Sequence, residues 1–167
     1  MIIFIRTFLI LSLILLFSCK NNKEVSKPEI KNEDLNILMI EAYQEGLNEL
    51  ENGYAILAAK KFNEAEILFP QSIWAPRSSL MAAYSYYSMD YYEDSINELI
   101  RFLKTYPNNI RTDYARYLLA INYYEQIINE KKDLGPILDA KNNFIIVKEN
   151  FPDSDFALDA EYKLNLI

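Results

Sequence analysis

A pattern of small and large apolar residues recurs three times along the chain, each time ahead of an aromatic residue followed by proline. The aromatic-proline pairs are Phe69-Pro70, Tyr106-Pro107 and Phe151-Pro152. A small residue lies twelve positions before each proline and a large apolar residue lies eight positions before it: Ala58, Ser95 and Ala140, then Phe62, Leu99 and Phe144. A small side chain lets two helices approach closely, and a large one from the neighbouring helix fills the space between them. Because one such unit cannot bury its apolar face alone, the recurrence predicts stacked helical repeats.

Each repeat is predicted to be a pair of helices that ends at the proline. Matching positions in the first helices hold small residues, Gly46, Ala83 and Ala120. The predicted helices cover residues 35–51, 54–69, 73–89, 91–105, 111–130, 136–150 and 155–167. The predicted fold class is all-α: a tetratricopeptide-like α-solenoid of antiparallel helix pairs, with about three repeats plus one further helix.

Capping residues support these helix boundaries. We expect Asp90, with Glu93 three residues later, to cap the second helix of the middle pair. Ser72 and Ser154 are expected to cap the helices that follow the first and third prolines. The last helix has no partner behind it, which we interpret as a cap or as the end of a truncated chain. Its apolar ending, residues 164–167, favours truncation.

The only cysteine of the chain, Cys19, lies where an apolar run gives way to a polar segment. The run Phe8–Phe17 would span about 15 Å as a helix, half of a ~30 Å hydrocarbon core, which is typical of a signal-peptide hydrophobic region. The order Leu16-Phe17-Ser18-Cys19 resembles the lipobox of bacterial lipoproteins. This resemblance implies cleavage before Cys19 and a covalent lipid on it, with palmitate among the acyl chains. The alternatives are an uncleaved signal anchor and a cysteine with no role in processing.

These features divide the chain into three segments. We predict a signal peptide at residues 1–18, a lipidated flexible tether at 19–34 and the tetratricopeptide-like domain at 35–167. The tether is polar, mixed in charge and interrupted by Pro28, and random-coil scaling gives it a reach of about 20 Å. Acyl chains on Cys19 would hold the domain on a membrane surface, because each buried CH₂ contributes about 0.8 kcal/mol.

Composition argues against two classes of function. The formal net charge is −7, so phosphate backbones would be repelled and we expect no nucleic-acid partner. The chain has no histidine, its one cysteine is assigned to the lipid, and it has no glycine-rich phosphate loop. The usual bases, nucleophiles and metal ligands are therefore missing, and carboxylates such as Glu64 and Glu66 are interpreted as solvated. We expect no enzymatic activity, no metal and no cofactor other than the lipid.

Tyrosine and aliphatic residues recur at i, i+4, i+7 on the first helix of each pair, which places each trio on one stripe: Tyr43, Leu47 and Leu50; Leu80, Tyr84 and Tyr87; Tyr117, Ile121 and Tyr124. Tyrosine combines a broad apolar face with a hydroxyl group, which suits a groove that binds extended peptide. Three arginines near the starts of these helices are candidates to hold a carboxylate: Arg77, Arg111 and Arg116. The predicted peptide-binding residues are Tyr43, Leu80, Tyr84, Tyr87, Tyr117, Tyr124 and Arg77. The alternatives are stripes that pack between repeats and arginines that are solvated or paired with local acids.

Three stretches carry a more specific resemblance: Trp74–Pro107, Asp113–Ile127 and Phe151–Leu166. They resemble the BamD family, the tetratricopeptide lipoproteins of the outer-membrane β-barrel assembly machinery, in its α-proteobacterial form. The resemblance extends over nearly all of 38–167. The chain departs from the family pattern at 129–135, which lacks an Arg-Asp-Gln stretch, and in having fewer than the usual five repeats.

The resemblance implies a scaffold that is lipid-anchored on the periplasmic face of the outer membrane. Its implied partners are the POTRA domain of BamA, other Bam lipoproteins and the C-termini of unfolded outer-membrane proteins, which it would help to insert into the membrane. Lys20 after the cysteine, in place of aspartate, supports sorting to the outer membrane. The alternative is a generic tetratricopeptide lipoprotein adaptor of the cell envelope, serving peptidoglycan coordination or secretin assembly.

Overall fold

The computed structural model describes residues 32–127 and 134–167, and these two stretches contain helices and turns but no strand. The helices are α2 (Asn32–Glu51), α3 (Ala55–Leu68), α4 (Trp74–Tyr87), α5 (Tyr92–Thr105), α6 (Thr112–Glu125), α7 (Gly135–Asn150) and α8 (Asp155–Leu164). The predicted all-α solenoid is confirmed. The predicted signal peptide, Cys19 and most of the predicted tether lie outside the described residues.

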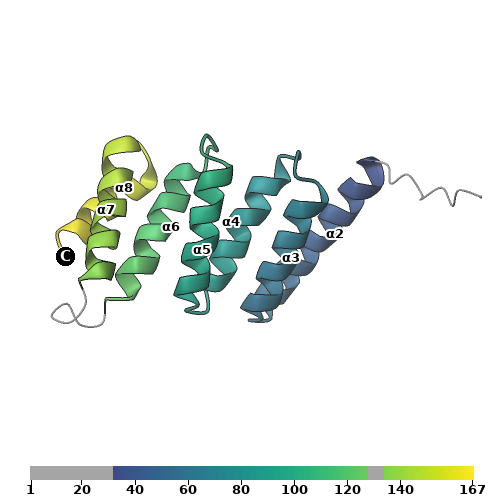
Figure 1. Ribbon diagram of the computed structural model, residues 1–167, viewed down its shortest axis with the longest axis horizontal. Coiled ribbons are helices and arrows are strands. Elements are labelled where there is room, and N and C mark those ends of the chain that lie inside the picture. Colours follow the sequence, from purple (N-terminus) through teal and green to yellow (C-terminus); the bar gives the residue numbers. More distant parts are fainter. Residues whose placement is uncertain (1–31, 128–133) are drawn as a thin grey trace, which may run out of the picture. The chain divides into compact units, whose positions relative to one another are not determined.

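Within the unit Lys31–Ile167, each helix packs against the next one along the chain (Figure 1). The first helices of neighbouring pairs also touch, because α4 contacts α6 and α6 contacts α8. Buried side chains form three successive clusters, centred on Phe62, Phe102 and Phe144. A core divided in this way is characteristic of a solenoid, in which each repeat buries its apolar face only against its neighbours.

The small and large residues of the repeat occupy the core as the pattern predicts. Phe62, Leu99 and Phe144 are fully buried, and so are the small residues four positions before them. Gly46 shows why a small residue is needed at its position in α2. A Cβ atom there would come within 2.8 Å of Cε1 of Phe62, so only a glycine leaves room for the ring.

Helix boundaries differ from the prediction in several places. Helix α2 begins three residues earlier than expected, at Asn32, and α6 ends at Glu125 instead of residue 130. The predicted cap at Asp90 is wrong. Asp90 has φ 63°, α5 begins at Tyr92, and the Tyr92 hydroxyl donates a hydrogen bond to Asp90 Oδ1 over 2.7 Å. Aspartate tolerates this left-handed conformation because its short polar side chain can bond locally.

The two predicted serine caps have different outcomes. Ser72 Oγ accepts a hydrogen bond from the backbone N–H of Trp74, over 3.1 Å, at the start of α4. Ser154 precedes α8, but its side chain makes no capping hydrogen bond. Both inter-repeat turns have the same backbone hydrogen bond, from Ser72 N to Phe69 O and from Ser154 N to Phe151 O, each of 3.0 Å. The turn before α4 differs only in the additional side-chain bond from Ser72.

Candidate functional site

Two grooves run between the first helices of successive repeats. The α2–α4 groove has a volume of about 400 Å³ and is lined by Met39, Ile40, Tyr43, Gln44, Leu47, Trp74 and Arg77. The α4–α6 groove has a volume of about 480 Å³ and is lined by Ile73, Pro76, Arg77, Leu80, Met81, Tyr84, Asn109, Ile110, Arg111 and Tyr114. Because Arg77 lines both, the two grooves adjoin at this side chain. Their volumes lie in the range of ordinary ligand pockets.

Aromatic rings form the wall of the α2–α4 groove near Arg77. Tyr43 is 7% exposed, and its ring packs edge-on against Phe62 and Trp74, with centroid distances of 5.1 Å and 5.2 Å. The guanidinium carbon of Arg77 lies 4.9 Å from the Trp74 centroid and 5.6 Å from the Tyr43 centroid. These distances allow cation–π attraction, which holds the charged group at the junction of the grooves.

The α4–α6 groove combines a partly buried apolar wall with exposed aliphatic side chains. Leu80 is 8% exposed and Tyr84 is 37% exposed. Ile73 and Ile110 are 87% and 88% exposed, and each lies three residues after a repeat proline, in the turn before α4 or α6. Nearly full exposure of two equivalent isoleucines beside a groove leaves apolar surface available to a ligand.

The charge of the grooves is opposite in sign to that of the chain. No aspartate or glutamate lines either groove, whereas Arg77 and Arg111 both do. Across residues 32–127 and 134–167, neither guanidinium forms an ion pair, and neither donates a side-chain hydrogen bond. In a chain of net charge −7, the grooves are therefore locally cationic and apolar.

The pKa of the Tyr114 hydroxyl is shifted by its surroundings in the α4–α6 groove. The pKa of Tyr114 is raised from 10.0 to about 12, mainly by burial and to a smaller extent by the nearby Tyr84 and Tyr87 hydroxyls. The positive charge of Arg111 acts in the opposite direction. Because Arg111 lowers the pKa of Tyr114, its positive charge lies close enough to interact with the Tyr114 hydroxyl.

The structure brings together four of the seven predicted peptide-binding residues. Tyr43, Arg77, Leu80 and Tyr84 line the two grooves. The other three, Tyr87, Tyr117 and Tyr124, line neither groove. Their role as ligand contacts stays a prediction.

Packing explains where those three tyrosines lie. The Tyr117 hydroxyl donates a hydrogen bond to Asp159 Oδ2 over 2.6 Å, and its ring stacks on Phe156 of α8. The Tyr124 ring packs on Phe144 and lies 4.5 Å below the Lys163 ammonium nitrogen. Tyr87 packs against both the second and the third core clusters. These contacts match the alternative interpretation, in which part of the stripe packs between repeats.

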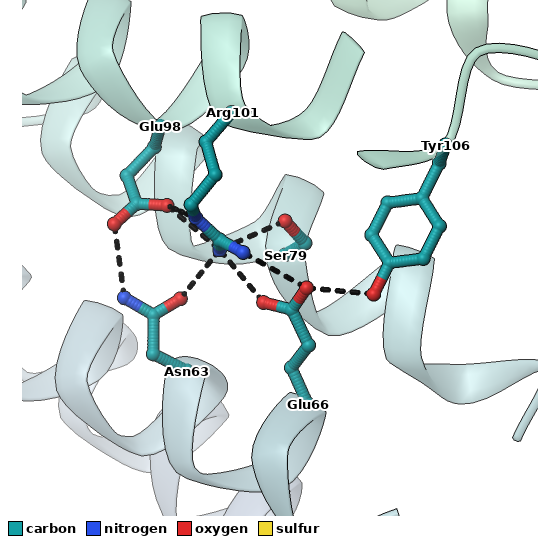
Figure 2. Close-up of polar contacts among 6 residues, drawn as sticks. All are labelled: Asn63, Glu66, Ser79, Glu98, Arg101 and Tyr106. Carbon is teal, nitrogen blue, oxygen red and sulfur yellow. Dashed lines mark hydrogen bonds and ion pairs between the residues drawn. The ribbon is translucent and has the colours of Figure 1, made fainter. Parts of the chain in front are cut away.

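A polar network joins the first two repeats through α3, α4 and α5 (Figure 2). The Arg101 guanidinium donates two hydrogen bonds to the Glu66 carboxylate, of 2.9 Å and 2.7 Å, and one to Glu98 over 2.8 Å. It also donates to Asn63 Oδ1 and to Ser79 Oγ, over 3.1 Å and 3.0 Å. The hydrogen bonds to Glu66 raise the pKa of Arg101 above its usual value. The guanidinium is therefore ionised at neutral pH.

The prediction that Glu66 is solvated is wrong. It is 6% exposed and is not solvated, because Arg101 and the Tyr106 hydroxyl both donate to its carboxylate. Burial, followed by the hydrogen bond to Glu66, raises the pKa of Tyr106. No sequence signal marked this network, because the positions equivalent to Arg101 in the other repeats are Glu64 and Ile146.

The described part of the chain holds no group of three or more histidine, cysteine, aspartate or glutamate side chains placed to bind a metal ion. None of its helices has the length and apolarity needed to cross a membrane.

Residues 36–167 match a protein-family model described as YfiO: outer membrane lipoprotein. Several similar proteins are each named outer membrane protein assembly factor BamD. The one from Caulobacter vibrioides is 31% identical over 144 residues, covering 86% of this chain and 47% of the relative. The one from Rickettsia prowazekii is 29% identical over 154 residues, covering 92% and 59%. The one from Neisseria meningitidis serogroup B is 26% identical over 159 residues, covering 89% and 59%.

The chain thus spans about half the length of the relatives it matches. The matched region contains the six helices from α3 to α8 and most of α2, and with them both grooves and the network around Arg101. The resemblance inferred from Trp74–Pro107 and the two later stretches is confirmed. The chain belongs to the YfiO family of outer membrane lipoproteins.

Proposed function

We propose that this chain is a scaffold in the assembly of outer-membrane β-barrel proteins, and that its two grooves bind unfolded barrel precursors. The observation that carries the proposal is the pair of adjoining grooves along α2, α4 and α6, which are apolar, cationic and joined at Arg77. An extended chain with alternating apolar side chains can place them in successive grooves. The relatives named as outer membrane protein assembly factors support this choice of ligand.

The proposal includes a lipid anchor and protein partners. Cys19 carries the lipid and holds the domain on the periplasmic face of the outer membrane, as the lipobox-like order Leu16–Cys19 suggests. The proposed partners are the POTRA domain of BamA and other Bam lipoproteins. The role is one of binding, with no catalytic step.

Site-specific crosslinking tests the groove assignment. A photoreactive amino acid is placed at Leu47, at Tyr84 or at Ile100, and the lipidated protein is mixed with a peptide from the last strand of a barrel protein. Leu47 and Tyr84 line the two grooves and are each 37% exposed, whereas Ile100 on α5 is 48% exposed and lines neither. We expect crosslinks from Leu47 and Tyr84 and none from Ile100. Equal crosslinking from Ile100, or no crosslinking from the groove positions, contradicts the proposal.

Co-purification tests the partners. The lipidated full chain, extracted from its own membranes in mild detergent, is expected to bring down a barrel protein that carries POTRA domains. Recovery of a secretin or of a peptidoglycan-binding lipoprotein in its place would assign the chain to a different envelope complex.

A further inference from the structure

The turns between repeats carry two unusually exposed isoleucines. Ile73 and Ile110 are 87% and 88% exposed, more than any other large apolar side chain among residues 32–127 and 134–167. Each lies three residues after a repeat proline, and both line the α4–α6 groove, so the two side chains lie near each other at one end of it. Single exposed apolar residues are common on protein surfaces. Two at the same position of neighbouring repeats form one paired apolar surface.

The backbone of each turn is closed by an internal hydrogen bond. In the first turn, the N–H of Ser72 donates to the carbonyl of Phe69 over 3.0 Å. In the second turn, the N–H of Asn109 donates to the carbonyl of Tyr106 over 3.1 Å. A backbone group that is already bonded costs less to transfer from water into an apolar medium than a free one. The turns can therefore bring their isoleucines into an apolar surface without breaking these two bonds.

Both turns lie at the edge of the solenoid where α2 begins (Figure 1). Cys19, the proposed site of the lipid, precedes Asn32 by thirteen residues. A random coil of that length has an end-to-end distance of about 20 Å. Helix α2 has 20 residues and is therefore about 30 Å long. With the lipid inserted in a membrane, the edge where α2 begins is thus closer to the membrane surface than the edge where α2 ends.

The charges at this edge suit phospholipid headgroups only near the second turn. Arg111 directly follows Ile110, and its guanidinium forms no ion pair with any described residue. A guanidinium can bind a headgroup phosphate through two parallel hydrogen bonds. Glu33 and Asp34 lie in the first turn of α2, and Asp155 occupies the position equivalent to the isoleucines in the third inter-repeat turn. Apolar burial at the first two turns therefore provides most of the contact.

We propose that Ile73 and Ile110 insert into the phospholipid surface beside the lipid anchor, and that Arg111 binds a headgroup phosphate there. The α4–α6 groove, which all three residues line, then opens at the membrane surface. A lipid on Cys19 limits only the distance between the domain and the membrane, whereas this contact also fixes the orientation of the domain. The inference rests on the lipid anchor of the proposed function and adds to it a membrane-binding edge.

The only tryptophan of the chain makes the contact measurable, because Trp74 follows Ile73 directly. The lipidated full chain is reconstituted into vesicles of phosphatidylethanolamine with a minor fraction of phosphatidylglycerol, prepared with either ordinary or brominated acyl chains. Bromine quenches tryptophan fluorescence only at short range. The ratio of emission in brominated vesicles to emission in ordinary vesicles therefore measures how closely Trp74 approaches the hydrocarbon. For the unmodified protein we expect a ratio well below one.

Two double variants test which side chains make the contact. Ile73→Ser with Ile110→Ser removes both apolar side chains without changing the net charge, and the ratio should return to one. The matched control is Ile56→Ser with Ile100→Ser, at residues of α3 and α5 that are 55% and 48% exposed and line neither groove. Its ratio should stay as low as that of the unmodified protein. Circular dichroism checks that both variants keep their helices.

Flotation of the vesicles on a density gradient separates this inference from the proposed function. Protein that floats with the vesicles but is not quenched would overturn the inference, leave the anchor intact and leave the two isoleucines to a protein ligand. Quenching that persists in Ile73→Ser with Ile110→Ser would also overturn it, and so would an equal loss of quenching in the control. Protein that does not float would overturn the lipid anchor of the proposed function together with this inference.

Discussion

Arg101 and Glu66 form a bidentate ion pair between the first two repeats, with hydrogen bonds of 2.9 Å and 2.7 Å. The Arg101 guanidinium also reaches Ser79 of α4, over 3.0 Å. Ser79 is two residues from Arg77, so the two side chains leave α4 about 200° apart and on nearly opposite sides. Arg101 therefore contacts α4 on the side opposite to the one that forms a wall of both grooves.

Removing Arg101 should destabilise the protein strongly. Arg101→Ala leaves the Glu66 carboxylate, whose side chain is 8% exposed, buried without its cationic partner. We expect a loss of about 3 kcal/mol in the free energy of unfolding, measured by urea denaturation. The control is Lys61→Ala, which breaks an exposed pair with Glu45 and should cost less than about 1 kcal/mol. Equal losses in the two variants would show that the buried pair adds nothing beyond a surface contact.

Gly46→Ala should destabilise the protein although alanine is the better helix former. The added Cβ would meet three atoms of the buried Phe62 ring at 2.8 Å, 2.9 Å and 3.1 Å. Overpacking of this kind costs about 1–3 kcal/mol, against a gain of up to about 1 kcal/mol in helix propensity. We expect a net loss of about 1 kcal/mol in urea denaturation.

Asn48→Ala, at an exposed position of the same helix, is the control for this substitution. It improves helix propensity without entering the core and should leave stability unchanged or slightly higher. A more stable Gly46→Ala variant would mean that Phe62 can move away at little cost.

Stability should fall at alkaline pH, in part because of Tyr114. Its pKa is about 12 in the folded protein and near 10.0 in an unfolded chain, so the folded state retains a proton that the unfolded state loses. The stabilisation is complete below about pH 10 and is lost as the pH rises through about 12. In Tyr114→Phe, the urea midpoint should therefore decline less between about pH 9 and 11 than in the unmodified protein. Tyr162→Phe, at a residue that is 60% exposed, should decline like the unmodified protein.

Cys19→Ser should abolish lipid attachment. The proposed function assigns the acyl chains to this thiol, which is the only cysteine of the chain. Cells grown with labelled palmitate should incorporate label into the unmodified protein and none into the variant, which should also leave the membrane fraction. Ser18→Ala keeps a small residue before the cysteine and should be labelled normally. Labelled Cys19→Ser protein would contradict the assignment.

Much of the fold could be predicted because the repeat pattern depends on the spacing of residues within one helix pair. A small residue followed four positions later by a large one fixes which helix face is buried, and Phe62 and Phe144 are both fully buried as expected. The prediction was wrong at Asp90, where the same local sequence can form either a helix cap or a left-handed turn. Asp90 was expected to cap α5, but it adopts a left-handed conformation and accepts a hydrogen bond from Tyr92.

The candidate site was predictable in part. Tyr84 was identified from its helical register and Arg77 from its position near the start of a helix, and both line a groove. The same register does not distinguish Tyr117, because its ring meets Phe156 of α8, a helix more than thirty residues away in the chain. Whether a tyrosine on this stripe faces solvent or a neighbour depends on what the next repeat places opposite it.

The sequence alone therefore determined the helix pairs, their order and the buried face of each, because these depend on spacing within one repeat. Only the tertiary structure decided that Arg101 would reach Glu66 and Ser79, and that Arg77 would lie between two grooves without a carboxylate partner among the described residues. Burial of apolar residues follows the period of the helix and can therefore be predicted from residue spacing. A hydrogen bond or ion pair between repeats requires two particular atoms to come within bonding distance, and residue spacing within one repeat does not predict this distance.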